Sequence, residues 1–375
     1  MKLLPGEKLV LVLQGGGALG AYQAGAYEAL AEAGLEPEWV AGISIGAING
    51  AIIAGNRPED RVEKLREFWE GISDGVETTP LGGTNVRVAL NEFNAARVAT
   101  FGVPGFFSPR IPPAFFLPPG SRGATSVYTT DPLRQTLHSL VDFDVLNDGK
   151  IRYSAGAVEI TTGNFAYFDS TNTTLSADHI MASSALPPGF PPIVIDGKAY
   201  WDGGVVSNTP MQYVLEMTGQ RSDMCVFQVD LFSARGRMPQ ALPDVVQREK
   251  EVRYSSRTRL NTQFFLELQS MRRAYHRLHE KLPPELRNDR DAKMLEERAC
   301  CASITIVHLI HRRQAYDRYS MDYEFSRLSM LEHWKAGLDD VRHTLSQPAW
   351  RERNKPELGV TVLDLTRDTE DEIAK

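Results

Sequence analysis

Short apolar runs alternate with helical patterns in the first part of the chain. Leu9 to Leu13 is continuously apolar, as is typical of a parallel strand covered on both faces, and the glycines from Gly15 onward end it. The pattern then predicts a helix over Ala21 to Ala33, a strand over Trp39 to Ile43, and a small-residue helix over Ile45 to Ala54. This order of strand, helix, strand and helix predicts an α/β fold with a mainly parallel central sheet.

Further helices and strands follow in the middle of the chain. Asp196 and Gly197 suit a tight hairpin turn between two short strands. The predicted helices cover 59–72, 132–140 and 177–183, and the predicted strands cover 152–158, 165–169, 193–195, 200–201 and 226–231.

Residues 102–125 show no regular period and are rich in proline and aromatic side chains. Long irregular loops within compact domains are often lids or binding loops. We therefore expect residues 101–117 to form either a hydrophobic lid that opens onto a lipid surface or a buried cover of the core. The large apolar side chains of this stretch are Phe101, Phe106, Phe107, Phe115, Phe116 and Leu117.

The last third of the chain differs in composition. It is rich in arginine and predicted to be helical over 244–299, apart from Pro283 and Pro284, with a strand over 303–310. Ser329 and Glu332 are spaced as a capping box at the start of a final helix. We expect a main domain over 1–234 and a mostly helical extension over 235–375 packed on it, whose arginines form a solvated surface or contact an anionic one.

Composition narrows the class of protein. The net charge of −7 over 375 residues argues against a nucleic-acid partner, which requires a basic surface. Only Cys225, Cys300 and Cys301 are present, which fits a reducing compartment. The first apolar run is too short for a signal peptide or a membrane span. We therefore expect a cytoplasmic protein without a transmembrane segment, with peripheral contact to a membrane left open.

Gly42-Ile43-Ser44-Ile45-Gly46 matches the pattern Gly-x-Ser-x-Gly at a strand end and a helix start. A serine at such a turn is exposed on a strained backbone, and the flanking glycines Gly42 and Gly46 leave room for neighbouring backbone. The positive end of the following helix lies beside any oxyanion formed there. Ser44 is therefore a candidate nucleophile, the alternative being a surface serine in a glycine-rich turn.

Gly15, Gly16 and Gly17 follow the first strand and could offer backbone N–H groups to an oxyanion. Through Gly15, Gly17 and Gly20 the same stretch also matches Gly-x-Gly-x-x-Gly, the pattern of a dinucleotide site. Such a site requires an acidic residue at the end of the second strand, where this chain has Ser44. The nucleotide interpretation is therefore disfavoured.

A serine nucleophile needs a base. Asp202 followed by Gly203 and Gly204 is the best candidate, because the glycines allow close backbone approach around the carboxylate, although an ordinary turn after Trp201 is the alternative. Histidines are less suited, because they lie in predicted helices or strands rather than glycine-rich loops. The histidines considered are His276, His279, His308 and His311.

The three glycine-rich motifs, in this order, resemble those of the patatin-like phospholipases over about residues 8–210. The resemblance implies a three-layer α/β fold, a catalytic dyad of Ser44 and Asp202, and an oxyanion hole at Gly15 to Gly17. Gln14 departs from the family, since many members have Asp there. The arginine-rich tail resembles the C-terminal extension of a bacterial subset.

The resemblance implies hydrolysis of lipid acyl esters through an acyl-Ser44 intermediate, with no metal or cofactor. One alternative is an esterase that acts on polyester or soluble short-chain esters. The other, of a different class, is a dinucleotide- or phosphate-binding module in which Ser44 is only a turn residue.

Overall fold

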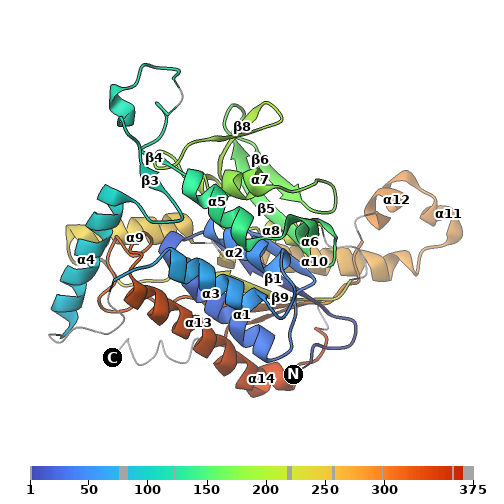
Figure 1. Cartoon of the computed structure of the whole chain (residues 1–375). Helices are drawn as coiled ribbons and strands as arrows, with labels where there is room; N and C mark the ends of the chain where they lie inside the picture. The colour runs from blue at the N-terminus through green and yellow to red at the C-terminus, as the bar shows by residue number, and fades with distance from the viewer. Residues whose placement is uncertain are drawn as a thin grey trace.

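The protein is described by a computed structural model that covers residues 2–75, 83–121, 123–217, 222–255, 258–297, 299–356 and 359–365. Within these residues a nine-stranded sheet has the order β11-β10-β9-β1-β2-β5-β8-β7, with β6 also paired to β5 (Figure 1). The strands from β11 to β5 run parallel, whereas β6, β7 and β8 pair antiparallel. The strands are β1 (Lys8–Leu13), β2 (Trp39–Gly42), β5 (Arg152–Glu159), β6 (Phe165–Asp169), β7 (Ile193–Ile195), β8 (Lys198–Asp202), β9 (Met224–Asp230), β10 (Ile304–Ile310) and β11 (Val360–Leu363).

Both faces of this sheet are covered by helices, as the apolar run in β1 predicts. Leu9, Leu11 and Leu13 point into the larger core, whereas Val10 and Val12 point into a second core on the opposite face. The larger core includes residues of α1 (Ala21–Glu32), α2 (Ile45–Ala54), α3 (Arg61–Gly71) and α13 (Arg327–Ser346), and the second includes residues of α8 (Met211–Glu216) and α10 (Thr258–His279). The expected three-layer, mainly parallel α/β fold is confirmed.

The remaining described helices surround these layers. The α-helices are α4 (Gly83–Phe101), α5 (Asp131–Leu140), α6 (Phe143–Asn147), α7 (Ala177–Ser183), α9 (Leu242–Tyr254), α11 (Pro284–Arg287), α12 (Arg290–Glu296) and α14 (Pro348–Arg351). The short 3-10 helices are η1 (Gly17–Gly20), η2 (Ala114–Phe116) and η3 (Gly203–Val205), and a small separate sheet pairs β3 (Ser108–Pro109) with β4 (Tyr128–Thr129). No described helix is both long and apolar enough to span a membrane.

The C-terminal part of the chain extends the same layers. Strand β10 pairs in parallel with β9, and β11 pairs with β10, so both continue the central sheet. Helix α13 packs across α1 at Gly25 and Gly337, where the two backbones touch. The division at residue 234 stays a prediction, but the strands and helix beyond it share the core of the first part.

Two details differ from the expectations. The cap of α13 is Ser326, whose side chain accepts the N–H of Ser329, and not the predicted pair of Ser329 and Glu332. Glu332 instead pairs with buried Arg87 at 2.7 Å, a contact between distant segments that local spacing cannot reveal. Helix α4, which contains Arg87, was not anticipated.

The apolar stretch 101–117 divides into two kinds of environment. Phe106 and Phe107 are 5% and 6% exposed and belong to the larger core, so the expectation of a buried cover holds for these two. Phe115 and Phe116 are 94% and 80% exposed and cover nothing within the described chain. Core cover therefore describes Phe106 and Phe107 but not Phe115 and Phe116, and a lid over residues 101–117 stays a prediction.

Candidate active site

Ser44 lies in a strained turn between β2 and α2. Its backbone has φ 55° and ψ −124°, which a non-glycine residue rarely adopts. The turn is tight, since a Cβ at Gly42 would lie 2.3 Å from the Gly46 carbonyl oxygen and one at Gly46 would lie 2.4 Å from that of Leu13. Both glycines are therefore required for this turn, which leaves Ser44 partly exposed at the start of α2.

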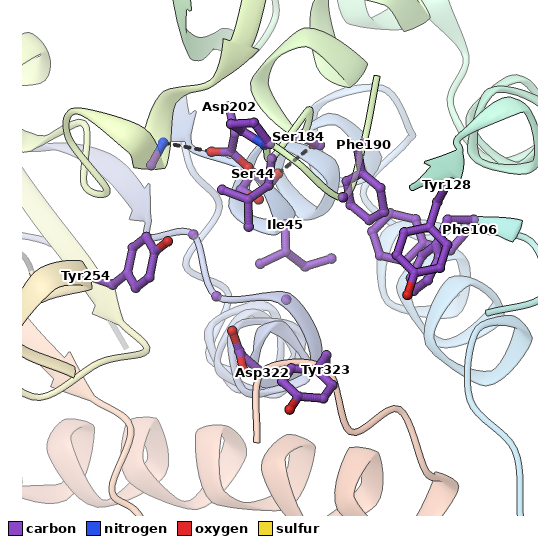
Figure 2. Close-up of a pocket in the computed structure, with 18 of the residues that line it drawn as sticks. Ser44, Ile45, Phe106, Tyr128, Ser184, Phe190, Asp202, Tyr254, Asp322 and Tyr323 are labelled. Carbon is purple, nitrogen blue, oxygen red and sulfur yellow. Dashed lines mark hydrogen bonds between the residues drawn. The ribbon is translucent and has the colours of Figure 1, made fainter. Parts of the chain in front are cut away.

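Two serines at the end of α7 hold the turn in place. The Ser44 N–H donates to the carbonyl oxygen and the Oγ of Ser183, at 3.2 and 3.1 Å. The hydroxyl of Ser184 donates to the Ser44 carbonyl oxygen at 3.2 Å (Figure 2). Neither serine was singled out from the sequence, because their role depends on a contact across about 140 residues of chain.

Asp202 ends β8 beside Ser44 and is 1% exposed (Figure 2). Its Oδ1 accepts the N–H of Gly204 at 2.7 Å. Its Oδ2 has no hydrogen bond of ordinary geometry with any described residue. Burial raises the pKa of Asp202 to about 7, although the nearby Ser44 hydroxyl and the Gly204 N–H both act to lower it. The serine and a carboxyl of altered acidity are thus brought together, as their motifs predicted.

The glycine loop after β1 forms the next wall of the site. Gly15 donates its N–H to the Asn208 carbonyl oxygen at 3.1 Å, and Ala18 donates to the Asp322 carbonyl oxygen at 2.8 Å. Between them, the N–H groups of Gly16 and Gly17 have no acceptor among the described residues. The expectation that Gly15 also offers its N–H is therefore corrected, because that group is already paired.

Side-chain amides hold this loop against the end of α9. Asn208, just after the Asp202 motif, donates from Nδ2 to the carbonyl oxygens of Gly15 and Tyr254, both at 2.9 Å. A Cβ at Gly17, which has φ 55°, would lie 2.1 Å from the carbonyl oxygen of Asp322. The loop is thus fixed on one side by Asn208 and on the other by the chain around Asp322.

Gln14 uses all of its hydrogen-bonding capacity beneath the loop. Its Oε1 accepts the N–H groups of Leu231 and Phe232 at 2.6 and 2.9 Å. Its Nε2 donates to Thr209 Oγ1 at 3.0 Å and to the Tyr254 carbonyl oxygen at 3.2 Å. A carboxylate could accept the first pair of bonds but could not donate the second. Gln14 can therefore donate a hydrogen bond to Tyr254 in the C-terminal part of the chain, which Asp at this position could not do.

These groups open into a cavity of about 460 Å³. Figure 2 shows Ser44 and Asp202 on one side, with Phe106, Tyr128 and Phe190 to the right. The apolar part of the wall is formed by Ile45, Val98, Ala99, Phe106, Phe107, Tyr128, Leu186, Pro187, Pro188, Phe190, Phe232 and Phe325. The more polar part, beyond the glycine loop, includes Tyr254, Tyr319, Asp322 and Tyr323.

The polar wall of the cavity comes from the C-terminal part of the chain, and no sequence pattern predicted it. Lys250 forms an ion pair with Asp322, and its ammonium lies 4.2 Å from the centre of the Tyr319 ring and 5.3 Å from that of Tyr323. Burial raises the pKa of the Asp322 carboxyl, and the charge of Lys250 opposes that rise. The recurrence of tyrosine at positions 316, 319 and 323 was a visible but unspecific signal.

None of the histidines considered as alternative bases lines the cavity. His311 is buried elsewhere, against His333, with 3.0 Å between Nε2 and Nδ1, and burial lowers its pKa to about 4. Among the described residues, no three His, Cys, Asp or Glu side chains gather as a metal site would require.

Comparison with known proteins gives family matches over most of the chain. The family model described as patatin-like phospholipase matches residues 11–215, and one described as patatin phospholipase matches residues 252–357. Lysophospholipase NTE1 of Kluyveromyces lactis is 26% identical over 65% of this chain and 14% of its own length. Patatin-like phospholipase domain-containing protein 7 of Rattus norvegicus is 38% identical over 20% of this chain.

The chain spans only 6% of the length of that rat protein. Among solved structures, VipD from Legionella pneumophila aligns with 99% of this chain and 74% of its own, at 13% identity and a TM-score of 0.36.

Proposed function

Since the chain belongs to the patatin-like phospholipase family, whose members are serine hydrolases, we propose that it hydrolyses carboxylic esters with Ser44 as nucleophile and Asp202 as base. One observation carries this proposal. Ser44 occupies a strained turn beside a buried carboxyl whose Oδ2 is not otherwise engaged and whose pKa is raised to about 7. A base of that pKa can exchange protons near neutral pH.

In the proposed reaction, Asp202 takes the Ser44 proton as Oγ attacks the ester carbonyl carbon. The N–H groups of Gly16 and Gly17 stabilise the resulting oxyanion, assisted by the positive end of α2. Collapse breaks the bond to the leaving alcohol, which receives the proton from Asp202. Water then attacks the carbonyl carbon of acyl-Ser44 and gives a proton to Asp202. The bond between that carbon and Ser44 Oγ breaks, Oγ takes the proton back from Asp202, and the acid is released.

The shape of the cavity favours lipid acyl esters as substrates. Its aromatic and aliphatic part suits an acyl chain, because burying apolar chain against apolar wall is favourable. The polar part, near Asp322 and the tyrosines, suits the alcohol portion. The lysophospholipase named among the relatives is consistent with this assignment. We propose a cytoplasmic enzyme that meets its substrate at a lipid surface, without a nucleic-acid partner.

A fluorophosphonate probe tests the proposal, since it should label Ser44. Ser44→Ala should lose both the label and at least about a thousandfold of the ester hydrolysis, with unchanged melting temperature. Ser139→Ala, which removes an exposed hydroxyl on α5, should keep both. Labelling at another residue, or hydrolysis retained by Ser44→Ala, would contradict the role of Ser44.

The same experiment separates the alternatives. A nucleotide-binding module would show nucleotide-dependent thermal stabilisation and no labelling. An enzyme for soluble or polyester substrates would label at Ser44 but prefer short acyl chains over lipid in vesicles.

A further inference from the structure

Residues 108–121 and 123–129 form an arm that stands away from the layered body (Figure 1). Strands β3 and β4 pair at its base, with Ser108 opposite Thr129 and Pro109 opposite Tyr128. The chain between them turns through η2, where Phe116 and Leu117 donate backbone hydrogen bonds to Pro113 and Ala114. We call this segment the 108–129 arm.

The end of the 108–129 arm is apolar and exposed. Ile111 is 94% exposed, Phe115 94% and Phe116 80%, although side chains of this kind are normally buried. Five prolines between residues 109 and 119 lie before, between and after these side chains and restrict the backbone that presents them. Helix α4, which leads into this region, ends in the exposed Phe101. An exposed apolar cluster of this size indicates a contact surface.

The charge of the arm points to the kind of partner. Residues 102–127 contain Arg110 and Arg122 but no Asp or Glu, in a chain whose net charge is −7. Aromatic side chains combined with basic ones, without acidic ones, suit the interface of a membrane that contains anionic lipid. A lipid surface accepts an exposed apolar tip of this shape without a matching groove.

The base of the 108–129 arm is also the wall of the active-site cavity. The rings of Phe107 and Tyr128 lie 4.8 Å apart, and Phe107 lies 5.1 Å from Phe190. Tyr128 donates its backbone N–H to Gly189 at 2.9 Å. All four residues line the cavity that holds Ser44. An apolar path therefore connects the base of the arm to the proposed nucleophile.

We propose that the 108–129 arm inserts its tip into the surface of a lipid bilayer and holds the cavity against it. Docking itself does not depend on catalysis, whereas the benefit to turnover rests on the proposed function. The binding partner is the lipid surface. Ile111, Phe115 and Phe116 would enter it, while Arg110 would stay at the lipid headgroups.

The binding test uses the full chain with Ser44→Ala, so that no lipid is consumed. The protein is sedimented with phosphatidylcholine vesicles that either contain or lack phosphatidylserine. We expect binding that increases with the anionic lipid. Adding Phe115→Ala and Phe116→Ala should weaken it at least about tenfold, because two inserted rings are lost. The matched control removes two exposed apolar side chains from α11 and α12, by Leu286→Ala and Met294→Ala, and should bind unchanged.

The activity test uses the chain with Ser44 intact. Phe115→Ala with Phe116→Ala should leave the melting temperature and the hydrolysis of a soluble short-chain ester unchanged and lower turnover of vesicle lipid about tenfold or more. Equal vesicle binding with and without the two rings, or no vesicle binding at all as for an arm that docks on a protein, would overturn the proposal. Vesicle binding without hydrolysis of any ester would instead contradict the proposed function and leave the arm's role standing.

Discussion

The buried carboxyl of Asp202 should make the rate of hydrolysis depend on pH. Its pKa is raised to about 7 by burial, and only the ionised form can accept the Ser44 proton. We therefore expect kcat/KM for a soluble ester to rise with pH through about 7 and to level off above it. A rate profile measured between about pH 5 and pH 9 checks this. A profile that is flat across that range would show that Asp202 is not the base.

The same residue should reduce the stability of the fold at neutral and alkaline pH. An ordinary Asp in the unfolded chain ionises near 3.8, whereas Asp202 in the folded protein ionises near 7. The folded state therefore binds the Asp202 proton more tightly than the unfolded state does. The loss of folding free energy caused by the buried charge is absent below about pH 4 and complete above about pH 7. Asp202→Asn removes this penalty while its side-chain oxygen can still accept the Gly204 N–H.

We accordingly expect Asp202→Asn to abolish hydrolysis as fully as Ser44→Ala and to raise the free energy of unfolding at pH 8 by up to about 4 kcal/mol. The gain should shrink as the pH falls toward 4. Chemical denaturation at pH 8 and pH 5 measures both values. A variant less stable than the wild type at pH 8 would contradict the assigned cause of the pKa shift.

At the scale of single residues, the sequence revealed the groups with distinctive local patterns. Ser44, Asp202 and the glycine loop could be predicted because each sits in a glycine-rich motif that is readable within a few positions. The contacts of Ser184, Asn208 and Gln14 could not, because their hydrogen bonds join segments from 140 to 240 residues apart. Long-range contacts of this kind leave no local periodicity.

At the scale of elements, helices α1 and α13 pack with their backbones in contact. A Cβ at Gly25 would lie 1.9 Å from the Trp334 carbonyl oxygen, and one at Gly337 would lie 1.9 Å from that of Tyr22. Neither carbonyl can move aside, because both belong to helix backbone. Gly25→Ala and Gly337→Ala should each therefore push the helices apart and destabilise the protein by about 1 to 3 kcal/mol.

Gly71→Ala provides the matched control for these helix glycines. Gly71 lies at the end of α3, and a Cβ there would meet nothing within 4 Å. Because alanine has the higher helix propensity, this change should be neutral or slightly stabilising. Thermal unfolding of the three variants measures the difference. If all three behaved alike, the close crossing of α1 and α13 would be wrong.

The elements that the sequence predicted well are those buried in the sheet. Strands β1 and β10 carry long apolar or β-branched runs, and α2 is flanked by the Ser44 turn and Gly55. Helix α4 was missed because its buried positions include Arg87, Asn91 and Asn94, so that it lacks a clear apolar face. A helix that buries polar groups through contacts with other segments cannot be recognised from its own pattern.

At the scale of the whole molecule, the C-terminal part completes surfaces of the N-terminal part. All seven residues of β9 are buried, and β10 pairs along the full length of that strand. Tyr22 on α1 is fully buried and donates its hydroxyl hydrogen bond to Asp340 on α13 at 2.7 Å. Tyr254 and Asp322 contribute to the cavity itself. The proposed catalytic groups are therefore enclosed by both parts of the chain.

This arrangement predicts that a chain ending at residue 234 cannot fold to an active enzyme. Removal of β10 would leave β9 as an open apolar edge, which favours aggregation, and removal of α13 would expose the face of α1. The glycine loop would also lose the carbonyl of Asp322 that accepts the Ala18 N–H. We expect this shortened chain to be insoluble or, if recovered, unlabelled by a fluorophosphonate.

The control for this shortened chain replaces residues 283–296 with a short glycine-serine linker. It is suitable because α11 and α12 contain no buried residue. The Glu296 carboxylate lies 3.7 Å from the His279 ring nitrogen, so α12 returns the chain to the end of α10, where a glycine-serine linker can rejoin it. This variant should stay soluble, label at Ser44 and keep its melting temperature within a few degrees. A soluble, labelled chain that ends at residue 234 would instead show that the hydrolase domain folds without β10 and α13, and that residues 235–375 are an addition the catalytic site does not need.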